Sequence, residues 1–305
     1  MGAATTTQVS SGQDRWRFEA GDLITAELTA MQRLGGGNAY EAYLAFDETT
    51  YAPVVVKVVR PAQVSDEGTL RGLRREIEAL GRSNHPAVVR LLRAEQAGDR
   101  PHLVLEQLDG PPLSKLIRKH GRLEPAQYLP LGIEVASALH YLHRQDLVHL
   151  DVKPSNIIMG APAKLIDLSV ARTTADAAAL DHPIGTDGYM APEQTDPPVT
   201  GSPGPAADVW GLGATLFEAV AGYRPFDEGD PDHRDVAARF PQVVDEPYVL
   251  PDHVPADVAA LIGAMLAPRP QDRPAPAEVA DAFGPILDRH PRGALGGWKV
   301  ALTAR

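Results

Sequence analysis

The pattern of apolar and polar residues in the first half of the chain predicts β-strands. Residues 54–59 form a β-branched run between two prolines, which is typical of a buried strand. Upstream, a glycine-rich turn over residues 34–38 lies between two strand-like segments. Two further strands are expected over residues 88–92 and 102–107.

A helix is predicted among these strands, over residues 69–82. Leu73, Ile77 and Leu80 lie on one stripe of this helix. Glu76 is three residues from Leu73 and four from Leu80, so its side chain is expected to project toward the packed face. This position makes Glu76 a candidate partner for a buried cation.

From residue 113 onward the apolar residues recur at helical spacing. Residues 125–144 are predicted to form a long amphipathic helix. A short strand is expected over residues 164–167, and a Pro/Gly-rich surface loop over residues 196–205. Further helices are expected over residues 207–221, 254–266 and 277–287.

This order of elements predicts an α+β fold with two lobes, a small lobe built on a sheet with one key helix and a larger, mainly helical lobe. The expected divisions are a flexible segment over residues 1–20, a small lobe over about 21–106, a connector over about 106–110, a large lobe over about 111–290 and a tail over 291–305.

Composition narrows the classes of function. The net charge of −11 and the pI of about 5.4 give no basic surface for nucleic acid or an anionic membrane. The absence of cysteine excludes disulfides, thiolate metal sites and cysteine nucleophiles. The longest apolar stretch, residues 210–223, contains Glu218 and is too short for a membrane span. We therefore predict a cytoplasmic protein without a membrane span.

Several polar side chains have positions that suggest chemistry. Lys57 interrupts the apolar run of a buried strand, and a buried ammonium is costly unless it is paired, for which Glu76 is the nearest candidate. After the long helix, Asp151 is followed by Lys153 and Asn156. The short strand at residues 164–167 then ends in a further carboxylate.

These groups match the requirements of phosphoryl transfer. Asn156 and Asp167 offer hard oxygen ligands of the kind that Mg²⁺ takes when it also holds phosphates. Asp151 supplies a proton acceptor, and Lys153 supplies a cation that neutralises phosphate charge.

With these motifs the chain resembles the protein kinase family, specifically its bacterial, eukaryotic-like (Hanks-type) serine/threonine branch. The resemblance runs from about residue 23 to residue 290, with the motifs in the family's order. Three more segments carry it: residues 185–193 (GTDGYMAPE), residues 208–213 (DVWGLG) and Arg273. It implies a two-lobed protein kinase fold whose small lobe is an antiparallel sheet, with ATP and a protein carrying a Ser or Thr acceptor as partners.

The resemblance also implies catalytic and metal-binding roles. Lys57, held by Glu76, is expected to contact the α- and β-phosphates of ATP. Asp151 is expected to orient the substrate hydroxyl or accept its proton, and Lys153 to neutralise the γ-phosphate. Asn156 and Asp167 are expected to hold Mg²⁺, with Mn²⁺ as an alternative metal.

Other residues are expected to bind the nucleotide or to brace the fold. The backbone of residues 106–108 is expected to meet adenine, Leu105 to guard the back of the pocket, and Ala42 and Val55 to sandwich the ring, with their sizes exchanged relative to the family. Glu193 and Arg273 are expected to form an ion pair, and Asp208 to cap the catalytic loop. The expected ATP contacts are Leu34, Gly35, Gly37, Ala42, Val55, Lys57, Leu105, Glu106 and Leu108.

Three further departures from the family pattern concern activity. Leu150 stands where regulated members have an arginine that pairs with a phosphorylated activation loop, so we predict activity that is independent of phosphorylation at Thr173 or Thr174. Ser169 replaces a glycine after the metal-binding aspartate and restricts the backbone. Tyr40 replaces the third glycine of the loop and is expected to limit loop closure or to cap the site, with slower nucleotide exchange.

Two alternative functions stay open at this point. A pseudokinase would use the same fold as a nucleotide-binding scaffold or a partner-regulating module. A small-molecule kinase is disfavoured, because residues 185–193 resemble the peptide platform of the protein-substrate branch. A homodimer or a regulatory partner protein is also open, since no residue singles out either.

Overall fold

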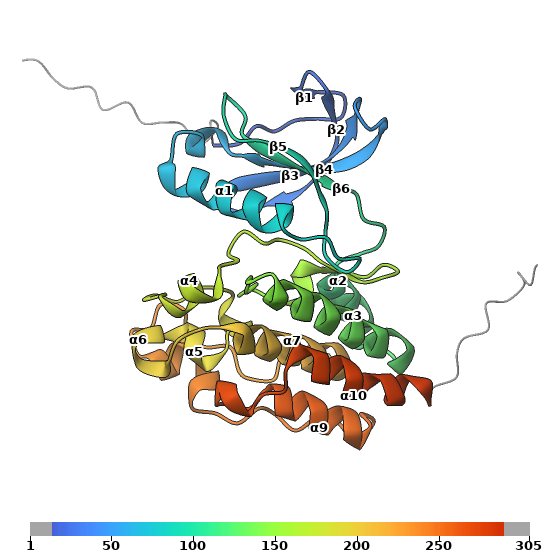
Figure 1. Cartoon of the computed structure of the whole chain (residues 1–305), viewed down its shortest axis with the longest axis vertical. Helices are drawn as coiled ribbons and strands as arrows, with labels where there is room; N and C mark the ends of the chain where they lie inside the picture. Colours follow the sequence, from blue (N-terminus) through green and yellow to red (C-terminus); the bar gives the residue numbers. More distant parts are fainter. Residues whose placement is uncertain (1–13, 290–305) are drawn as a thin grey trace, which may run out of the picture.

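The small lobe is a six-stranded sheet in which every hydrogen-bonded pair of strands is antiparallel. The computed structural model describes residues 14–289. Figure 1 shows this sheet above a larger helical lobe. The spatial order of the strands is β1-β2-β3-β4-β6-β5. Their bounds are Leu23–Thr25 (β1), Leu28–Gly36 (β2), Tyr40–Asp47 (β3), Ala52–Val59 (β4), Leu91–Glu95 (β5) and His102–Glu106 (β6).

Successive side chains of β4 point to opposite faces of the sheet, so one face carries buried valines and the other carries Lys57. We call the face that carries Lys57 the functional face. Val54, Val56 and Val58 are fully or almost fully buried in a cluster on one face of the sheet. Because successive side chains of a strand point to opposite faces, Val55 and Lys57 point to the other face. That second face is covered by helix α1, Glu67–Gly81, which lies beside the sheet in Figure 1.

Helix α1 confirms the predicted helix, with a start two residues earlier than expected. The side chain of Asp66 caps the helix by accepting a hydrogen bond from the amide of Thr69. Leu73, Glu76 and Leu80 are buried along its inner face. The spacing argument for Glu76 was therefore correct.

The last residues of the segment that was predicted to be flexible, residues 1–20, include two side chains that pack on the sheet. Trp16 and Phe18 stack on each other, and Phe18 meets the ring of Tyr43 edge-on. The indole N–H of Trp16 donates to the carbonyl of Val59 at 2.8 Å. The prediction rested on the small polar residues that dominate this segment and did not consider Trp16 and Phe18, which pack on the sheet. Residues 1–13 lie outside the described residues.

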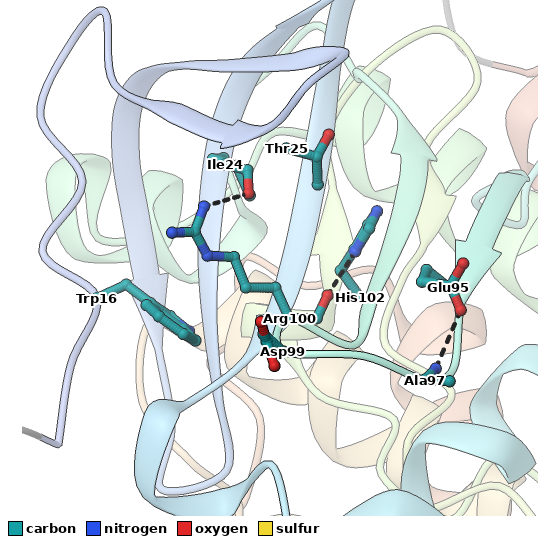
Figure 2. Close-up of a pocket in the computed structure, with 8 residues that line it drawn as sticks. All are labelled: Trp16, Ile24, Thr25, Glu95, Ala97, Asp99, Arg100 and His102. Atoms are coloured by element: carbon teal, nitrogen blue, oxygen red, sulfur yellow. Dashed lines mark hydrogen bonds between the residues drawn. The ribbon is translucent and has the colours of Figure 1, made fainter.

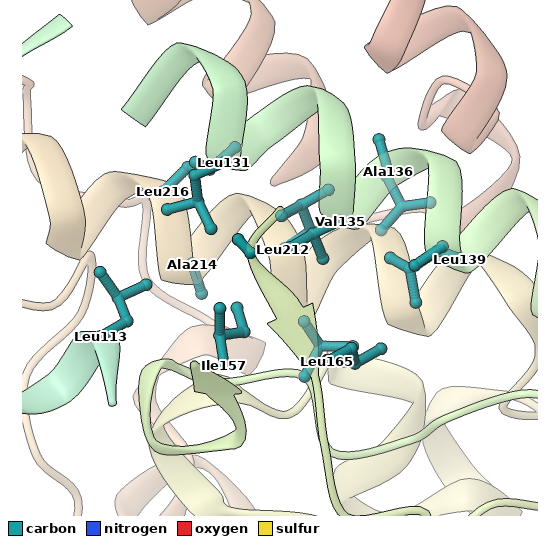
Figure 3. Packing of buried hydrophobic residues seen from close by; sticks show 14 of the residues in the cluster. Leu113, Leu131, Val135, Ala136, Leu139, Ile157, Leu165, Leu212, Ala214 and Leu216 are labelled. Carbon is teal, nitrogen blue, oxygen red and sulfur yellow. The ribbon is translucent and has the colours of Figure 1, made fainter. Parts of the chain in front are cut away.

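The large lobe is built around two central helices, α3 (Pro125–Arg144) and α7 (Pro205–Ala221). Almost every side chain of α7 is buried, as expected for a helix that is apolar on all sides. Figure 3 shows leucines and alanines of both helices packed against Ile157 and Leu165. The remaining helices are α2 (Leu113–His120), α4 (Thr174–Ala178), α5 (Pro192–Thr195), α6 (Pro197–Thr200), α8 (Val236–Arg239), α9 (Ala256–Met265) and α10 (Pro276–Asp288).

Two local predictions were wrong. The strand expected over residues 88–92 begins only at Leu91, because Val88 and Val89 are buried against Leu165 of the large lobe instead of pairing with β6. The loop expected over residues 196–205 contains the one-turn helix α6. Apolar periodicity does not distinguish a buried strand from a buried connection of the same length.

The two-lobed α+β architecture predicted from the sequence is confirmed. The connector passes through residues 107–112, after β6 and before α2. A two-stranded hairpin, β7 (Ile157–Ile158) and β8 (Lys164–Leu165), belongs to the large lobe, and its Leu165 pairs with Val88. Between residues 14 and 289, no helix is long and apolar enough to cross a membrane.

Candidate active site

The first part of the site is an ion pair between the small-lobe sheet and helix α1. The ammonium of Lys57 lies 2.8 Å from both carboxylate oxygens of Glu76. The side chain of Glu76 is 1% exposed and that of Lys57 is 15% exposed, so the pair is nearly dry. Lys57 and Glu76 were predicted to pair because a buried charge is costly without a partner, and the structure brings them together.

Lys57 also reaches the large lobe. Its ammonium donates to Asp167 Oδ1 at 2.9 Å, so a cation on β4 is held between carboxylates of both lobes. Burial alone would lower the pKa of Lys57, but the Glu76 and Asp167 carboxylates outweigh this effect and raise it above its usual value. Burial opposes ionisation of Asp167 as well, yet the Lys57 charge holds the pKa of this carboxyl well below its usual range. Both groups are therefore charged at neutral pH.

The second part of the site is a hydrogen-bonded cluster on the large lobe. Lys153 Nζ lies 2.7 Å from Asp151 Oδ2 and donates to Thr186 Oγ at 2.5 Å. Thr186 in turn donates to Asp151 Oδ1 at 2.7 Å. Asp151 is thus approached by a cation on one oxygen and by a hydroxyl on the other.

Asn156, a candidate metal ligand, links this cluster to Asp167, the other candidate metal ligand. Its amide N–H₂ donates to the carboxylate and to the backbone carbonyl of Asp151, each at 2.9 Å. The backbone amide of Ile166 donates to the backbone carbonyl of Asn156 at 2.8 Å. The β7–β8 hairpin therefore places Asp167, the next residue, beside Asn156. The structure therefore brings Asp151, Asn156 and Asp167 to one region.

The donor set fits a magnesium ion that is shared with phosphate oxygens. The side-chain amide of Asn156 makes its hydrogen bonds through its nitrogen. The carboxylate of Asp167 makes its hydrogen bonds through Oδ1. One amide oxygen and one carboxylate oxygen therefore remain for a hard cation. Among residues 14–289, no group of three or more His, Asp or Glu side chains is arranged to hold a metal by itself.

Asp208 on α7 fixes the backbone that carries this cluster. Its carboxylate accepts hydrogen bonds from the amides of His149 and Leu150 at 2.8 and 2.7 Å. Leu150 has a positive φ of 64°, which is strained for a leucine, so the two bonds help to hold this turn. The predicted capping role of Asp208 is confirmed.

The predicted adenine contacts line the functional face of the sheet and the connector. Ala42 lies directly opposite Lys57 in the sheet, and Val55 lies opposite Leu105. The carboxylate of Glu106 accepts hydrogen bonds from Lys164, at 2.5 Å, and from the amide of Arg90, at 2.9 Å. The amide of Glu106 donates to the carbonyl of Arg90 at 3.0 Å, so its backbone carbonyl is the group left to meet a base. Leu34 lies near the end of β2, beside the glycine-rich turn, and is 51% exposed.

The chain matches the family described as "Protein kinase domain" over residues 28–282. This chain belongs to the protein kinase family. It is 35% identical over 266 residues to the serine/threonine-protein kinase PknK of Mycobacterium tuberculosis (strain CDC 1551 / Oshkosh), an alignment that covers 84% of this chain and 23% of PknK. It is 30% identical over 269 residues to the serine/threonine-protein kinase PknB of Mycobacterium leprae (strain TN), covering 84% of this chain and 40% of PknB.

These similarities confirm the predicted protein kinase fold, and they place the resemblance among serine/threonine-protein kinases of bacteria. The matched segment spans less than half the length of either relative. What the full-length relatives act on is therefore not carried over to this kinase.

The glycine-rich hairpin of this kinase depends on a residue that sequence reasoning missed. Gly35 and Gly37 were singled out, but a side chain at Gly37 would meet nothing within 4 Å. At Gly36 a Cβ atom would lie 2.5 Å from the carbonyl oxygen of Tyr40, which is a severe clash. The hairpin therefore requires glycine at position 36, a need that three consecutive glycines in the sequence conceal.

A surface pocket lies apart from this site. Figure 2 shows it on the small lobe, where Arg100 donates to the carbonyl of Ile24 and its guanidinium lies over the ring of Trp16. None of the predicted site residues lines it. Its lining residues are Trp16, Ile24, Thr25, Glu95, Ala97, Asp99, Arg100 and His102.

Proposed function

We propose that this kinase transfers the γ-phosphate of ATP to serine or threonine hydroxyls of protein substrates. The observation that carries the proposal is the contact of Thr186 with both Asp151 and Lys153, at 2.7 and 2.5 Å. This contact ties the catalytic aspartate, the phosphate-neutralising lysine and the start of the segment expected to hold the substrate peptide into one unit.

Each side chain has a role in the proposed reaction. Asp151 orients the attacking hydroxyl and accepts its proton, and Lys153 neutralises charge that develops on the transferred phosphoryl group. Lys57 releases part of its contact with Asp167 and contacts the α- and β-phosphates, while Glu76 keeps its ammonium in position. Asn156 and Asp167 are the residues that would hold Mg²⁺, which when bound supplies further neutralisation of the phosphate charge.

The adenine site follows from the same frame. Ala42 and Val55 would cover the two faces of the base, and the backbone of Glu106 and Leu108 would bind its edge. Leu34, Gly35 and Gly37 would cover the nucleotide from above. Because Glu106 is engaged by Lys164, nucleotide selection at this point depends on backbone groups.

We also propose that activity does not require a phosphorylated activation loop. Leu150 is 3% exposed and occupies the position that carries the phosphate-binding arginine in regulated kinases. An aliphatic side chain buried at that position cannot pair with a phosphate. The assembled contacts of Lys57, Glu76 and Asp167 support activity without such a pair.

A pseudokinase is the second candidate, favoured by Tyr40, Leu150 and Ser169. Against it, every side chain that phosphoryl transfer needs is in contact with another member of the site. A scaffold would need neither the proton acceptor nor the Thr186 contact. A homodimer, a regulatory partner protein and a cytoplasmic location stay predictions from the sequence.

An autophosphorylation assay with Mg²⁺ and labelled ATP tests the proposal. The parent is expected to label itself or a basic generic protein on serine or threonine, identified by phosphoamino-acid analysis, and Asp151→Asn is expected to lose about 10²–10⁴-fold in rate. Nucleotide binding without transfer by the parent would instead establish the pseudokinase function. Mn²⁺ in place of Mg²⁺ tests the alternative metal.

A further inference from the structure

Tyr40 connects three parts of the small lobe. It is the first residue of β3, directly after the glycine-rich turn. Its ring lies 4.8 Å from the ammonium of Lys57, measured to the ring centroid. Its hydroxyl donates to the carbonyl of Thr69, in the first turn of α1, at 3.1 Å.

The strand register explains why one side chain reaches both places. Ala42 pairs with Lys57 across β3 and β4, so Tyr40, two residues earlier, lies on the same face as Lys57. A Cβ atom added at Gly72 would lie 3.5 Å from the Tyr40 hydroxyl. This is an ordinary van der Waals distance, so the phenol lies directly beside position 72 of α1.

The chemistry of both contacts is favourable. A lysine ammonium over a tyrosine ring is attracted by the negative face of the ring, and more strongly when water is excluded. Burial, the largest influence, raises the pKa of the Tyr40 hydroxyl to about 12, so the hydroxyl is protonated at neutral pH and can donate. Both contacts act on residues that position the catalytic ion pair.

The two ends of α1 are held in different ways. Beyond its C-terminal end, the hydroxyl of Tyr141 accepts a hydrogen bond from the amide of Asn84 and donates to the carbonyl of Arg82, which ties α1 to α3. At the N-terminal turn, apart from the backbone hydrogen bonds of the helix itself and the one from Tyr40, the hydrogen bonds of Asp66 and Thr69 stay within residues 63–70 in the described structure. Tyr40 therefore supplies a direct side-chain hydrogen bond between this turn and the sheet, whereas the backbone bonds from Asp66 through Gln63 and Arg60 reach the hairpin only in steps.

We propose that Tyr40 is a positioning residue that holds the first turn of α1 against the glycine-rich hairpin and directs Lys57 toward Glu76. The proposal rests on the proposed function and deepens it, because it names what keeps the catalytic ion pair assembled when Leu150 cannot bind a phosphorylated loop. The third glycine of the family loop is thereby exchanged for a side chain that supports catalysis.

Hydrogen exchange of the α1 amides tests the proposal independently of activity. Tyr40→Phe keeps the ring and loses the hydroxyl bond, and Tyr40→Leu loses both contacts. We expect α1 amides to exchange about 2- to 10-fold faster in Tyr40→Phe, the range that one neutral hydrogen bond gives, and faster still in Tyr40→Leu. Tyr51→Phe is the matched control, since Tyr51 is 78% exposed in the turn at the other end of β3. No change is expected there.

A double-substitution experiment asks whether Tyr40 acts through the ion pair. We expect Tyr40→Leu to lower kcat about 10-fold in the parent background and less than about twofold when Glu76→Gln is already present. Equal losses in both backgrounds, or α1 exchange that is unchanged in Tyr40→Phe and Tyr40→Leu, would overturn the proposal. If the parent transfers no phosphate, the proposed function fails, but the exchange experiment still decides the role of Tyr40.

Discussion

Arg273 donates to both carboxylate oxygens of Glu193, at 2.6 and 2.9 Å, and solvent reaches at most 2% of either side chain. The guanidinium also lies 5.0 Å from the ring centroid of Trp210 on α7. This buried pair joins the end of the 185–193 segment to the helical core. The predicted ion pair is confirmed, and its burial makes it a feature of stability as well as of position.

Removing one member of this pair is expected to be costly. Arg273→Met leaves the Glu193 carboxylate buried without a partner, which typically destabilises by about 3–5 kcal/mol. Arg269→Met is the matched control, because Arg269 pairs with Asp272 at the surface and is 73% exposed. Its cost is expected to stay below about 1 kcal/mol. Urea unfolding of both variants measures the difference, and similar values for the two would contradict the prediction.

A second ion pair predicts how stability depends on pH. Arg93 donates to both oxygens of Asp47 at 2.6 and 2.7 Å, and its hydrogen bonds hold the pKa of Asp47 well below its usual range. A carboxyl whose pKa is lowered by folding stabilises the folded state fully above its unfolded pKa of 3.8. That contribution is lost as the pH falls below 3.8 toward the folded pKa.

The measurement compares the parent with Asp47→Asn across pH 3–7. We expect the parent to be more stable than the variant at neutral pH, and the difference to shrink as the pH falls below about 4. Glu48→Gln, at an exposed position in the same turn, is the control and should leave the pH profile unchanged. A difference that grows toward low pH would show that the sign is wrong.

The contact between Lys57 and Glu76 could be predicted from the sequence. Each was unusual in its own element, a lysine in a buried strand and a glutamate on the packed stripe of a helix, and a buried charge requires a partner. Asp151, Lys153 and Asn156 were predicted to lie together because they are close in sequence, and the structure shows them in contact. Local spacing and the cost of burial were sufficient to predict these contacts; the catalytic roles stay predictions.

Contacts between distant segments could not be predicted in this way. Nothing in the sequence near Trp16 indicates that its indole reaches Val59, and nothing near Tyr40 names Thr69 as its partner. Val88 and Val89 read as a strand because a buried connection has the same composition. Gly36 was missed because the carbonyl that requires glycine comes from Tyr40, and its approach is set by the hairpin geometry.

Thr186 offers a test of the catalytic cluster. Thr186→Val removes its hydrogen bonds with Asp151 and Lys153 while keeping the shape of the side chain. Hydrogen bonds to charged groups are stronger than neutral ones, so we expect kcat to fall about 10- to 100-fold with the KM for ATP nearly unchanged. Thr186→Ser should restore most of the rate. A rate in the valine variant equal to that of the parent would exclude a role for this contact.

The activation segment carries the last prediction. Thr173 Oγ accepts a hydrogen bond from the amide of Asp176 and so caps α4, which gives this side chain a structural role without phosphate. Leu150 is buried and aliphatic, so a phosphate on Thr173 or Thr174 would find no cation at that position. The double variant Thr173→Ala/Thr174→Ala is therefore expected to keep its activity within about threefold of the parent. It should lose about 1 kcal/mol of stability with the cap. Steady-state rates beside thermal unfolding separate the two effects, and near-complete loss of activity in a folded variant would mean that loop phosphorylation controls this kinase after all.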